Sequence, residues 1–172
     1  MYKIGFIGAG SIVNAILTGM SKNKYDMSSI YVNSSTNDTK EKLCIEFGVN
    51  CAKNNVDVVK KCDYIFFAIK SHQYKGVIDE ISPYITDDKI FIIMAPGYTT
   101  EGFRQNVGKS VKIVRAMPNT PAIVGEAMTG ICYTKKDFTQ EEEKNILKIF
   151  EAFGKVQILD ESYMDIIVSV SA

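Results

Sequence analysis

The first residues with a chemical signature are two glycines near the start of the chain. Gly8 and Gly10 follow a short apolar run and precede a segment with helical spacing. In a strand–turn–helix unit, the first glycine permits a tight turn and the second lets the backbone approach a pyrophosphate at the helix N-terminus. The motif is degenerate, because Val13 stands where Gly or Ala is usual. We interpret it as a dinucleotide phosphate site, with a plain strand–helix turn as the alternative.

A second polar cluster lies about 20 residues further on, where a dinucleotide fold selects its cofactor. The segment reads Asn33-Ser34-Ser35-Thr36, with no carboxylate to bond the ribose hydroxyls and repel a 2′-phosphate. The serine and threonine hydroxyls can donate to phosphate oxygens, so the segment favours NADPH, with NADH as the alternative cofactor. No Arg follows, and Lys40 lies at least a helical turn away. A polar turn without selectivity is the competing interpretation.

A third candidate is the proline-bounded stretch Met117-Pro118-Asn119-Thr120-Pro121. The two prolines stiffen this loop and restrict the residues before them to extended conformations. It follows a predicted strand whose carboxyl end opens on the cofactor crevice. We therefore predict that the Asn119 amide is placed to bond the cofactor, and the alternative is a structural loop in which Asn119 caps its own turn.

The elements that position these residues alternate strictly. Short continuous apolar runs are separated by stretches with helical spacing, which is typical of parallel strands covered by helices on both faces. The sequence predicts a doubly wound α/β fold with a mostly parallel, Rossmann-type sheet and a truncated helical segment at its C-terminal end. The expected strands are residues 2–7, 30–32, 64–69, 90–94, 111–114 and 156–159.

The end of the chain carries its own signals. Thr139 and Glu142 form a capping box for a helix, and Gly154 suits the position just past its C-terminus. Residues 160–172 then show apolar side chains near helical spacing and stop without a cap. We expect residues 1–159 to form a nucleotide-binding domain, and residues 160–172 to begin a helical dimerisation and substrate domain that is otherwise missing.

Composition excludes several classes of partner. Twenty basic residues balance twenty acidic ones, so nothing points to nucleic acid, and no apolar run reaches the length of a membrane helix. No cationic leader opens the chain, and its four cysteines form no C-x-x-C pair. We predict a cytoplasmic protein with no metal site, whose cysteines are small buried thiols.

Several segments together resemble a known enzyme family, pyrroline-5-carboxylate reductase, over essentially the whole chain. The most specific of these segments is Val114–Pro121. The opening Gly5–Gly10 and the turn Ala95-Pro96-Gly97 also resemble the family. The segment Phe67–Lys70 also resembles the family. Ser71 and Pro96 depart from its pattern, where proline and alanine are usual.

The resemblance assigns roles to matching positions. The pyrophosphate would lie on residues 7–12 and the adenosine ribose and its phosphate near Ser34 or Ser35, while Asn55 would help to enclose the adenosine. Residues 68–71 and 94–96 would flank the nicotinamide. The predicted cofactor residues are Ile7, Gly8, Ala9, Gly10, Ser11, Ile12, Asn33, Ser34, Ser35, Asn55, Ala68, Ile69, Lys70, Ser71, Met94, Ala95, Pro96 and Asn119.

The implied reaction is NAD(P)H-dependent hydride transfer to the imine carbon of 1-pyrroline-5-carboxylate, a small-molecule substrate, to give proline. A cyclic imine can arrive protonated and already electrophilic, so we name no catalytic residue, although Lys70 and His72 are candidate proton donors. The alternatives are a β-hydroxyacid or prephenate-type dehydrogenase and a non-catalytic NADP(H)-binding module. A homo-oligomer is expected through the missing domain.

Arg104 and Arg115 are the only arginines, and Arg115 ends a predicted strand. We therefore expect that Arg115 could reach the crevice, bind the substrate carboxylate and give weak residual activity. The apolar residues of the last segment, Met164, Ile167, Val168 and Ser171, are expected to lie bare. That exposure would favour self-association or partial disorder from about Asp160 onward.

Overall fold

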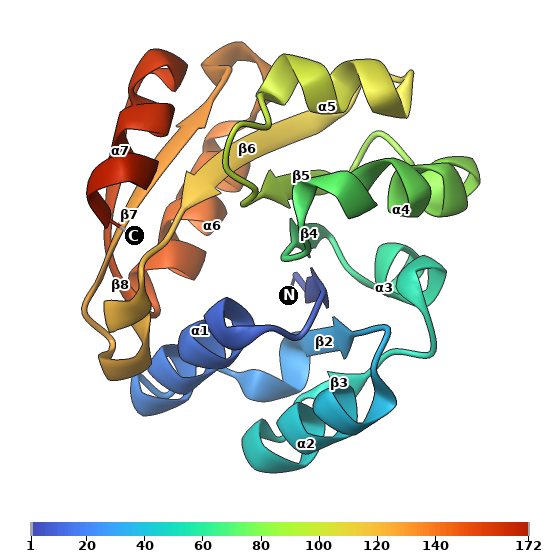
Figure 1. The fold of residues 1–172 in the computed structure, drawn as a ribbon, viewed down its shortest axis with the longest axis vertical. Coiled ribbons are helices and arrows are strands. Elements are labelled where there is room, and N and C mark those ends of the chain that lie inside the picture. The colour runs from blue at the N-terminus through green and yellow to red at the C-terminus, as the bar shows by residue number, and fades with distance from the viewer. Residues whose placement is uncertain (1, 172) are drawn as a thin grey trace.

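The computed structural model describes the backbone of residues 2–171 and the side chains of residues 2–167. Eight strands form one sheet in the order β3-β2-β1-β4-β5-β6-β7-β8, with helices on both faces (Figure 1). The first six strands run parallel, β7 is antiparallel to β6, and β8 is parallel to β7. The predicted doubly wound, mostly parallel fold is confirmed. The strands are β1 (Ile4–Ile7), β2 (Ile30–Asn33), β3 (Asn50–Cys51), β4 (Tyr64–Phe67), β5 (Ile90–Ile93), β6 (Lys112–Met117), β7 (Ala127–Tyr133) and β8 (Gly154–Ile158).

Two apolar cores lie on opposite faces of the sheet. Alternate strand residues such as Phe6 and Phe66 face α1, α2 and α6, whereas Ile65 and Phe67 face α3, α4 and α5. Continuous burial along β1, β4 and β5 explains why these strands read as unbroken apolar runs. The helices are α1 (Ser11–Lys22), α2 (Asn37–Phe47), α3 (Asn55–Lys61), α4 (Tyr74–Ile81), α5 (Thr100–Val107), α6 (Gln140–Glu151) and α7 (Met164–Ser171).

Both edges of the sheet differ from the sequence expectation. β3 and β7 were not predicted, and β7 reverses the chain direction. The capping box of α6 is confirmed, because Thr139 Oγ1 accepts from the Glu142 N–H at 3.2 Å while the Glu142 carboxylate accepts from the Thr139 N–H at 2.8 Å. Gly154, however, is not the residue just past the helix. It begins β8, where a Cβ would lie 2.3 Å from the Ala127 carbonyl oxygen.

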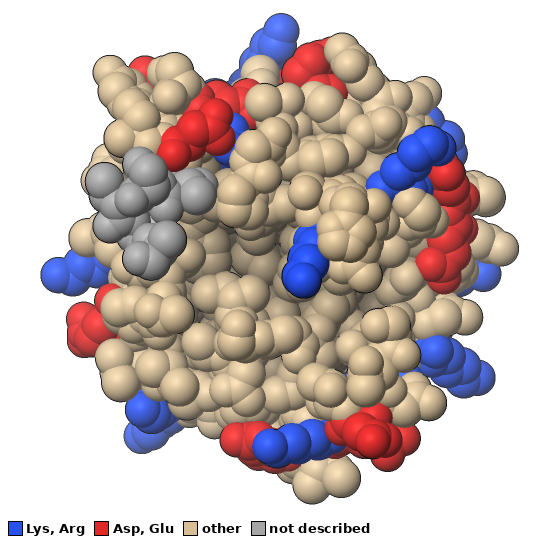
Figure 2. All heavy atoms as spheres, viewed as in Figure 1, with Lys and Arg blue, Asp and Glu red and all other residues tan. Residues whose placement is uncertain are grey.

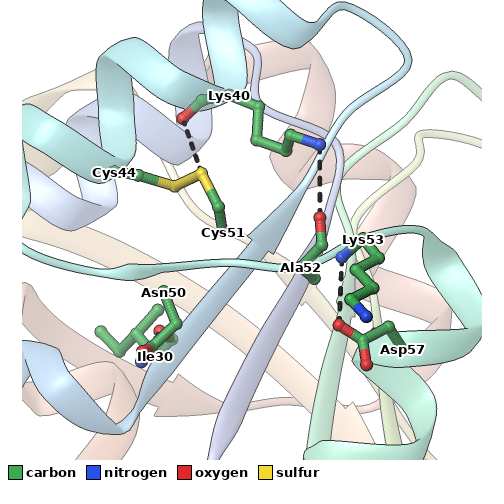
Figure 3. The surroundings of a disulfide bond; sticks show 8 residues. All are labelled: Ile30, Lys40, Cys44, Asn50, Cys51, Ala52, Lys53 and Asp57. Atoms are coloured by element: carbon green, nitrogen blue, oxygen red, sulfur yellow. Dashed lines mark hydrogen bonds between the residues drawn. A yellow bond between two sulfur atoms is a disulfide. The ribbon is translucent and has the colours of Figure 1, made fainter.

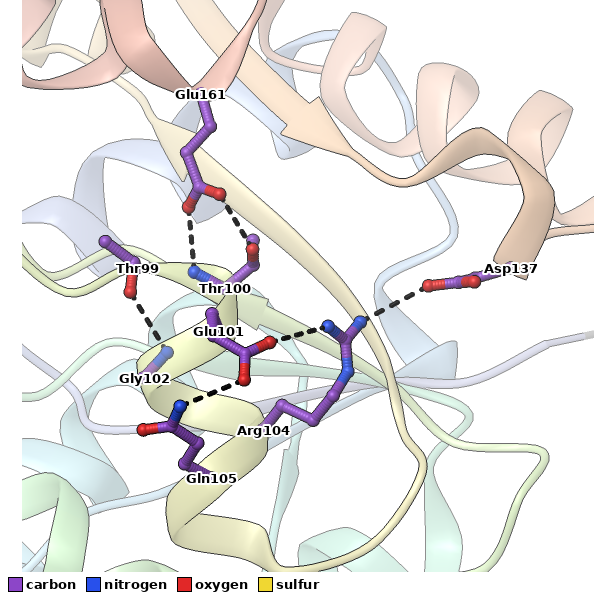
Figure 4. Close-up of polar contacts among 8 residues, drawn as sticks. All are labelled: Thr99, Thr100, Glu101, Gly102, Arg104, Gln105, Asp137 and Glu161. Carbon is purple, nitrogen blue, oxygen red and sulfur yellow. Dashed lines mark hydrogen bonds and ion pairs between the residues drawn. The ribbon is translucent and has the colours of Figure 1, made fainter.

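The C-terminal segment is anchored rather than bare, which corrects the expectation of exposed apolar residues. Met164 is fully buried, and Ile167 packs beside it against Met117 and Cys132. The Glu161 carboxylate accepts from both the N–H and the hydroxyl of Thr100 at 2.8 Å, which ties the segment to the start of α5 (Figure 4). The side chains of Val168 and Ser171 lie outside the described residues.

The cysteines also correct the sequence analysis. Cys44 and Cys51 form a disulfide between α2 and β3, and Cys51 is exposed. Only Cys62 and Cys132 are the buried thiols that we expected of all four. Within residues 2–171, no helix is long and apolar enough to cross a bilayer, and no cluster of three or more His, Cys, Asp or Glu residues could hold a metal ion.

Candidate functional site

A cavity of about 770 Å³ lies at the carboxyl ends of β1, β2, β4 and β5. In an open α/β sheet, ligands bind in the crevice at these ends, where the strand order reverses about the first strand. All of the residues that we predicted for the cofactor line this cavity except Asn119. Four further residues line the cavity that we did not predict as cofactor contacts, namely Phe67, His72, Gln73 and Val77. Among them, only His72 was named from the sequence, as a candidate proton donor.

The turn after β1 presents backbone to the cavity. Gly8 has φ +111°, and a Cβ there would lie 2.4 Å from the Ala68 carbonyl oxygen, so only glycine fits. Gly10 caps the N-terminus of α1 without a side-chain hydrogen bond, and a Cβ built on it meets nothing within 4 Å. The first turn of α1 contains no acidic residue, so its N–H groups and the helix dipole favour an anion at this point.

At the end of β2, Asn33 is buried and its amide is already engaged. Its Nδ2 donates to Asn55 Oδ1 at 2.7 Å, and Asn55 Nδ2 donates in turn to the exposed Glu80 carboxylate at 2.7 Å. The Asn33 carbonyl accepts from the Gly8 N–H at 2.8 Å, which joins this strand end to the phosphate turn. The relay therefore fixes Asn33 and Asn55 together beside the turn.

The loop after Asn33 carries two serines into the cavity lining. The Ser34 hydroxyl accepts from the Thr36 N–H at 3.3 Å, which leaves its O–H hydrogen able to donate to an anion. Lys40, the nearest cation identified in the sequence, donates from Nζ to the Ala52 carbonyl oxygen at 3.3 Å. The loop thus offers hydroxyl donors to an anion, while the Lys40 ammonium is held on the β3 side of α2.

The opposite end of the cavity rests on a buried tyrosine. The Tyr74 hydroxyl donates to the Phe67 carbonyl at 3.1 Å and accepts from the N–H groups of Met94 and Ala95 at 3.3 and 3.2 Å. Burial raises the pKa of Tyr74 well above its usual range, so the hydroxyl stays protonated and keeps its donor. Its ring belongs to an aromatic cluster whose other members are Phe67, Phe91, Tyr98 and Phe103.

One stretch of the cavity wall carries a cation, Lys70. Lys70, Ser71, His72 and Gln73 form this stretch, and the Lys70 N–H donates to Gln73 Oε1 at 3.1 Å, which closes a short 3-10 turn. No acidic side chain is among the described lining residues. Figure 2 shows the same face as Figure 1, with a hollowed and mostly uncharged centre, a basic side chain beside it, and both acidic and basic side chains toward the rim. These features suit an anionic ligand.

Asn119 lies outside the lining of this cavity, so its predicted cofactor contact stays a prediction. Its Oδ1 accepts from the Met128 N–H at 3.0 Å and thereby holds the start of β7. The prolines around it lead into a 3-10 helix over Thr120–Val124 that packs on α1, where a Cβ on Gly19 would lie 2.3 Å from the Ala122 carbonyl oxygen. These contacts favour the structural alternative for the Met117–Pro121 stretch.

The expectation that Arg115 reaches the crevice is wrong. Its side chain is 1% exposed, pairs with Asp165 and lies 3.8 Å from the Glu161 carboxylate, so both partners belong to the C-terminal segment. Arg104 is likewise engaged, because it pairs with Glu101 and Asp137 at 3.3 Å each (Figure 4). Neither arginine is available to bind a substrate carboxylate at the cavity.

Residues 3–97, which contain the phosphate turn and all of the described cavity lining, match the family model described as "NADP oxidoreductase coenzyme F420-dependent". The chain belongs to this family. The matched region ends just after Pro96, the last lining residue, so family membership and the cavity rest on the same part of the sheet.

Similar proteins extend the likeness over the whole chain. A pyrroline-5-carboxylate reductase from Escherichia coli (strain K12) is 34% identical over 170 residues, which cover 98% of this chain and 63% of that protein. A solved pyrroline-5-carboxylate reductase structure from Coxiella burnetii has a TM-score of 0.90 at 29% identity and covers 99% of this chain and 64% of its own. A Plasmodium falciparum pyrroline carboxylate reductase with NADP bound has a TM-score of 0.84 at 28% identity, over 99% and 62%. The chain therefore spans less than two thirds of the length of these relatives.

Proposed function

We propose that this chain forms the NADPH-binding part of an enzyme that reduces 1-pyrroline-5-carboxylate to proline. The observation that carries the proposal is the convergence of the predicted cofactor residues on one cavity at the switch point of the sheet. Relatives named as pyrroline-5-carboxylate reductases, one with NADP bound, support the choice of substrate and cofactor. No comparable observation favours a carbonyl dehydrogenase or a non-catalytic module.

The residues present fit a dinucleotide. Gly8 and Gly10 leave backbone and open space at the start of α1 for the pyrophosphate. Ser34 and Ser35 would donate to the 2′-phosphate, and the engaged amide of Asn33 presents no carboxylate to repel it. These features support a preference for NADPH over NADH.

The protein would contribute to the reaction by positioning the cofactor and the substrate and by excluding water from them. When bound, the cofactor supplies the hydride. The nicotinamide half would rest against an apolar surface formed by Ala68, Ile69 and Met94. The Tyr74 hydroxyl holds Met94 and Ala95 in place by accepting from their N–H groups. A protonated imine requires no proton from a side chain, so this arrangement needs no general acid among the lining residues.

We also propose a division of labour along the chain. Residues 1–159 would bind the cofactor, and residues 160–172 would begin the helical part that covers the crevice and mediates homo-oligomer formation. The anchoring of this segment by Arg115 and Thr100 supports a fixed direction of exit from the sheet. The proposed compartment is the cytoplasm.

The proposal is tested with the gene product that contains this chain. Purified protein is mixed with NADPH and 1-pyrroline-5-carboxylate, and loss of NADPH absorbance is followed together with formation of proline. We expect turnover with the imine and none with β-hydroxyacid or prephenate-type substrates and NADP⁺. Oxidation of those hydroxyacids without imine turnover would contradict the proposed substrate, and absence of NADPH binding would contradict the proposed cofactor site.

A further inference from the structure

The disulfide between Cys44 and Cys51 lies outside the cavity lining, in the two elements that follow the Ser34–Ser35 loop, and takes no part in the function described so far. It joins α2 to β3 (Figure 3). The two Cα atoms are 5.8 Å apart, within the range that a disulfide requires. Cys51 is exposed, so small thiols and disulfides in solution can reach it. The position combines correct backbone geometry with access, which are the two requirements for reversible thiol–disulfide exchange.

The other two cysteines provide an internal contrast. Burial raises the pKa of the Cys62 thiol to about 12 and that of the Cys132 thiol to about 12. Because the thiolate is the reactive form, these buried thiols are inert at neutral pH. Thiol chemistry in the folded chain is therefore directed to the pair at α2 and β3.

Besides the disulfide, helix α2 is attached through one buried side chain, the partly buried Phe47 and a few polar contacts. Leu43 is its only buried residue, and Ile45 is 85% exposed. Lys40 Nζ donates to the Ala52 carbonyl at 3.3 Å, and Cys51 Sγ lies 3.9 Å from the Lys40 carbonyl oxygen. Figure 3 shows these contacts beside the disulfide, all between α2 and the β3 region. A covalent bond here adds a local constraint to a helix that buries little of its own surface.

The constrained helix begins at Asn37, directly after the loop that carries Ser34 and Ser35. The loop is fixed at its other end by β2, where Asn33 bonds to Gly8 and Asn55. Holding α2 against β3 thus fixes the second end of the same loop. A loop fixed at both ends loses less conformational entropy when it binds a ligand.

We propose that Cys44 and Cys51 are a reversible redox site, oxidised by a small disulfide such as glutathione disulfide, and that oxidation strengthens NADPH binding by ordering the Ser34–Ser35 loop. This inference rests on the proposed NADPH site. NADH makes no contact through a 2′-phosphate, so its affinity changes less. Oxidation of the two cysteines therefore increases the preference for NADPH over NADH through the adenosine end of the cavity. It leaves the contacts at the nicotinamide end unchanged.

The exchange is balanced. The Cys51 thiolate attacks one sulfur of glutathione disulfide, a mixed disulfide forms, and one glutathione leaves as a thiolate that takes up a proton. The Cys44 thiolate then attacks the Cys51 sulfur, and the second glutathione leaves in the same way. The protein loses two electrons and two protons, and one glutathione disulfide becomes two glutathione molecules.

Linkage gives a reciprocal expectation. If oxidation tightens NADPH binding about three- to tenfold, which is the scale of a modest gain in preorganisation, bound NADPH must favour the disulfide by the same factor. For this two-electron couple, that factor corresponds to a reduction potential lower by about 15–30 mV when NADPH is bound.

The test measures the Kd for NADPH and for NADH with protein equilibrated in glutathione disulfide and in dithiothreitol. Mass spectrometry after alkylation of the unfolded protein identifies the protected cysteines. We expect Cys44 and Cys51 to be protected only after oxidation, and the oxidised form to bind NADPH about three- to tenfold more tightly. The double variant Cys44→Ser/Cys51→Ser should bind NADPH like the reduced protein in both buffers.

Three results would overturn the proposal. These are four alkylated cysteines after oxidation, equal NADPH affinity in the two redox states, or a redox response that persists in the double variant. If the wild-type protein and the double variant both fail to bind NADPH under either condition, the proposed function itself has failed. Equal and measurable NADPH affinities would instead leave the cofactor site intact and remove only the redox inference.

Discussion

The two ends of the cavity are built differently. At the proposed nicotinamide end, Met94 and Ala95 are held by the Tyr74 hydroxyl, whose ring lies in an aromatic cluster that is buried except for the partly buried Tyr98. At the adenosine end, the Ser34–Ser35 loop leads into α2, a helix with one buried residue and a disulfide. The first end is fixed by packing and the second by a few polar contacts and a covalent bond.

This difference separates two tasks. Hydride transfer depends on close positioning, which a packed core supplies, because core side chains cannot move without leaving voids. Cofactor choice depends on a few hydrogen bonds to one phosphate, which an exposed loop can supply and adjust. Substitutions at the two ends should therefore have different signatures, with equal effects on both cofactors at one end and selective effects at the other.

The largest effect is expected at the turn between the two ends. Gly10→Val should weaken NADPH and NADH binding by at least about 100-fold, because its side chain enters the space where backbone approaches the pyrophosphate. The fold should survive with a modest fall in melting temperature, since a Cβ at Gly10 meets nothing within 4 Å but valine is a poorer N-cap than glycine. Calorimetric titration and thermal unfolding measure the two quantities.

Gly76→Val is the matched control, because Gly76 is on the exposed side of α4 and a Cβ there also meets nothing within 4 Å. It should bind both cofactors normally. A Gly10→Val protein that unfolds would show that Gly10 is chiefly structural, and one that binds normally would place the pyrophosphate elsewhere.

At the nicotinamide end, Tyr74→Phe should lower the free energy of unfolding by about 1–3 kcal/mol, because two buried N–H groups lose their acceptor. NADPH and NADH affinities should fall by the same factor. Chemical denaturation gives the stability, and parallel titrations give the affinities. Tyr84→Phe, at a 41% exposed tyrosine, is the control and should change neither. A selective loss of NADPH affinity in Tyr74→Phe would contradict the proposed separation of the two ends.

At the adenosine end, the double variant Ser34→Ala/Ser35→Ala should weaken NADPH binding by about 1–2 kcal/mol, the scale of partly exposed hydrogen bonds to a charged group. NADH binding should remain nearly unchanged, because NADH lacks the 2′-phosphate. Ser82→Ala, at a serine whose hydroxyl bonds the Ile78 carbonyl, is the control and should leave both affinities unchanged. Equal losses for the two cofactors would mean that the serines do not contact the phosphate.

The smallest effect is expected for Asn55→Ala. This variant removes the acceptor for Asn33 and the link to Glu80, so the side wall of the adenosine end becomes less ordered. We expect the binding free energy of each cofactor to weaken by about 0.5–1.5 kcal/mol. Both cofactors should lose affinity to a similar extent, since the contact lies on the adenosine that they share. Asn50→Ala, which changes an asparagine bonded to Ser28 and Ile30 carbonyls at the other end of β2, should leave affinity unchanged. An Asn55→Ala protein that loses NADPH affinity alone would assign Asn55 to the phosphate.

The part of the fold that sequence could predict is the part with a local signal. Continuous apolar runs identified β1, β4 and β5, and the family resemblance assigned the turns after them to one cofactor site. β7 had no such signal. Its exposed Met128 and its glycine interrupt the apolar pattern, and its antiparallel direction depends on Asn119 and on the chain reversal around Gly125.

Long-range partners account for the other errors. Arg115 was expected to reach the crevice because it ends a predicted strand, but Asp165 lies fifty positions later and was not recognised as its partner. Cys44 and Cys51 lie in different elements, so their pairing depends on how α2 packs on β3. Tyr74 reads as an ordinary core residue, and its role depends on two N–H groups about twenty residues away.

The central claim is that this cavity binds NADPH and prefers it to NADH. Calorimetric titration of the purified protein with each cofactor under identical redox and salt conditions tests it most directly. We predict one NADPH site per chain and an affinity for NADPH that exceeds that for NADH by about 5- to 30-fold, which corresponds to about 1–2 kcal/mol. Equal affinities, a preference for NADH, or no binding of either cofactor would contradict the account.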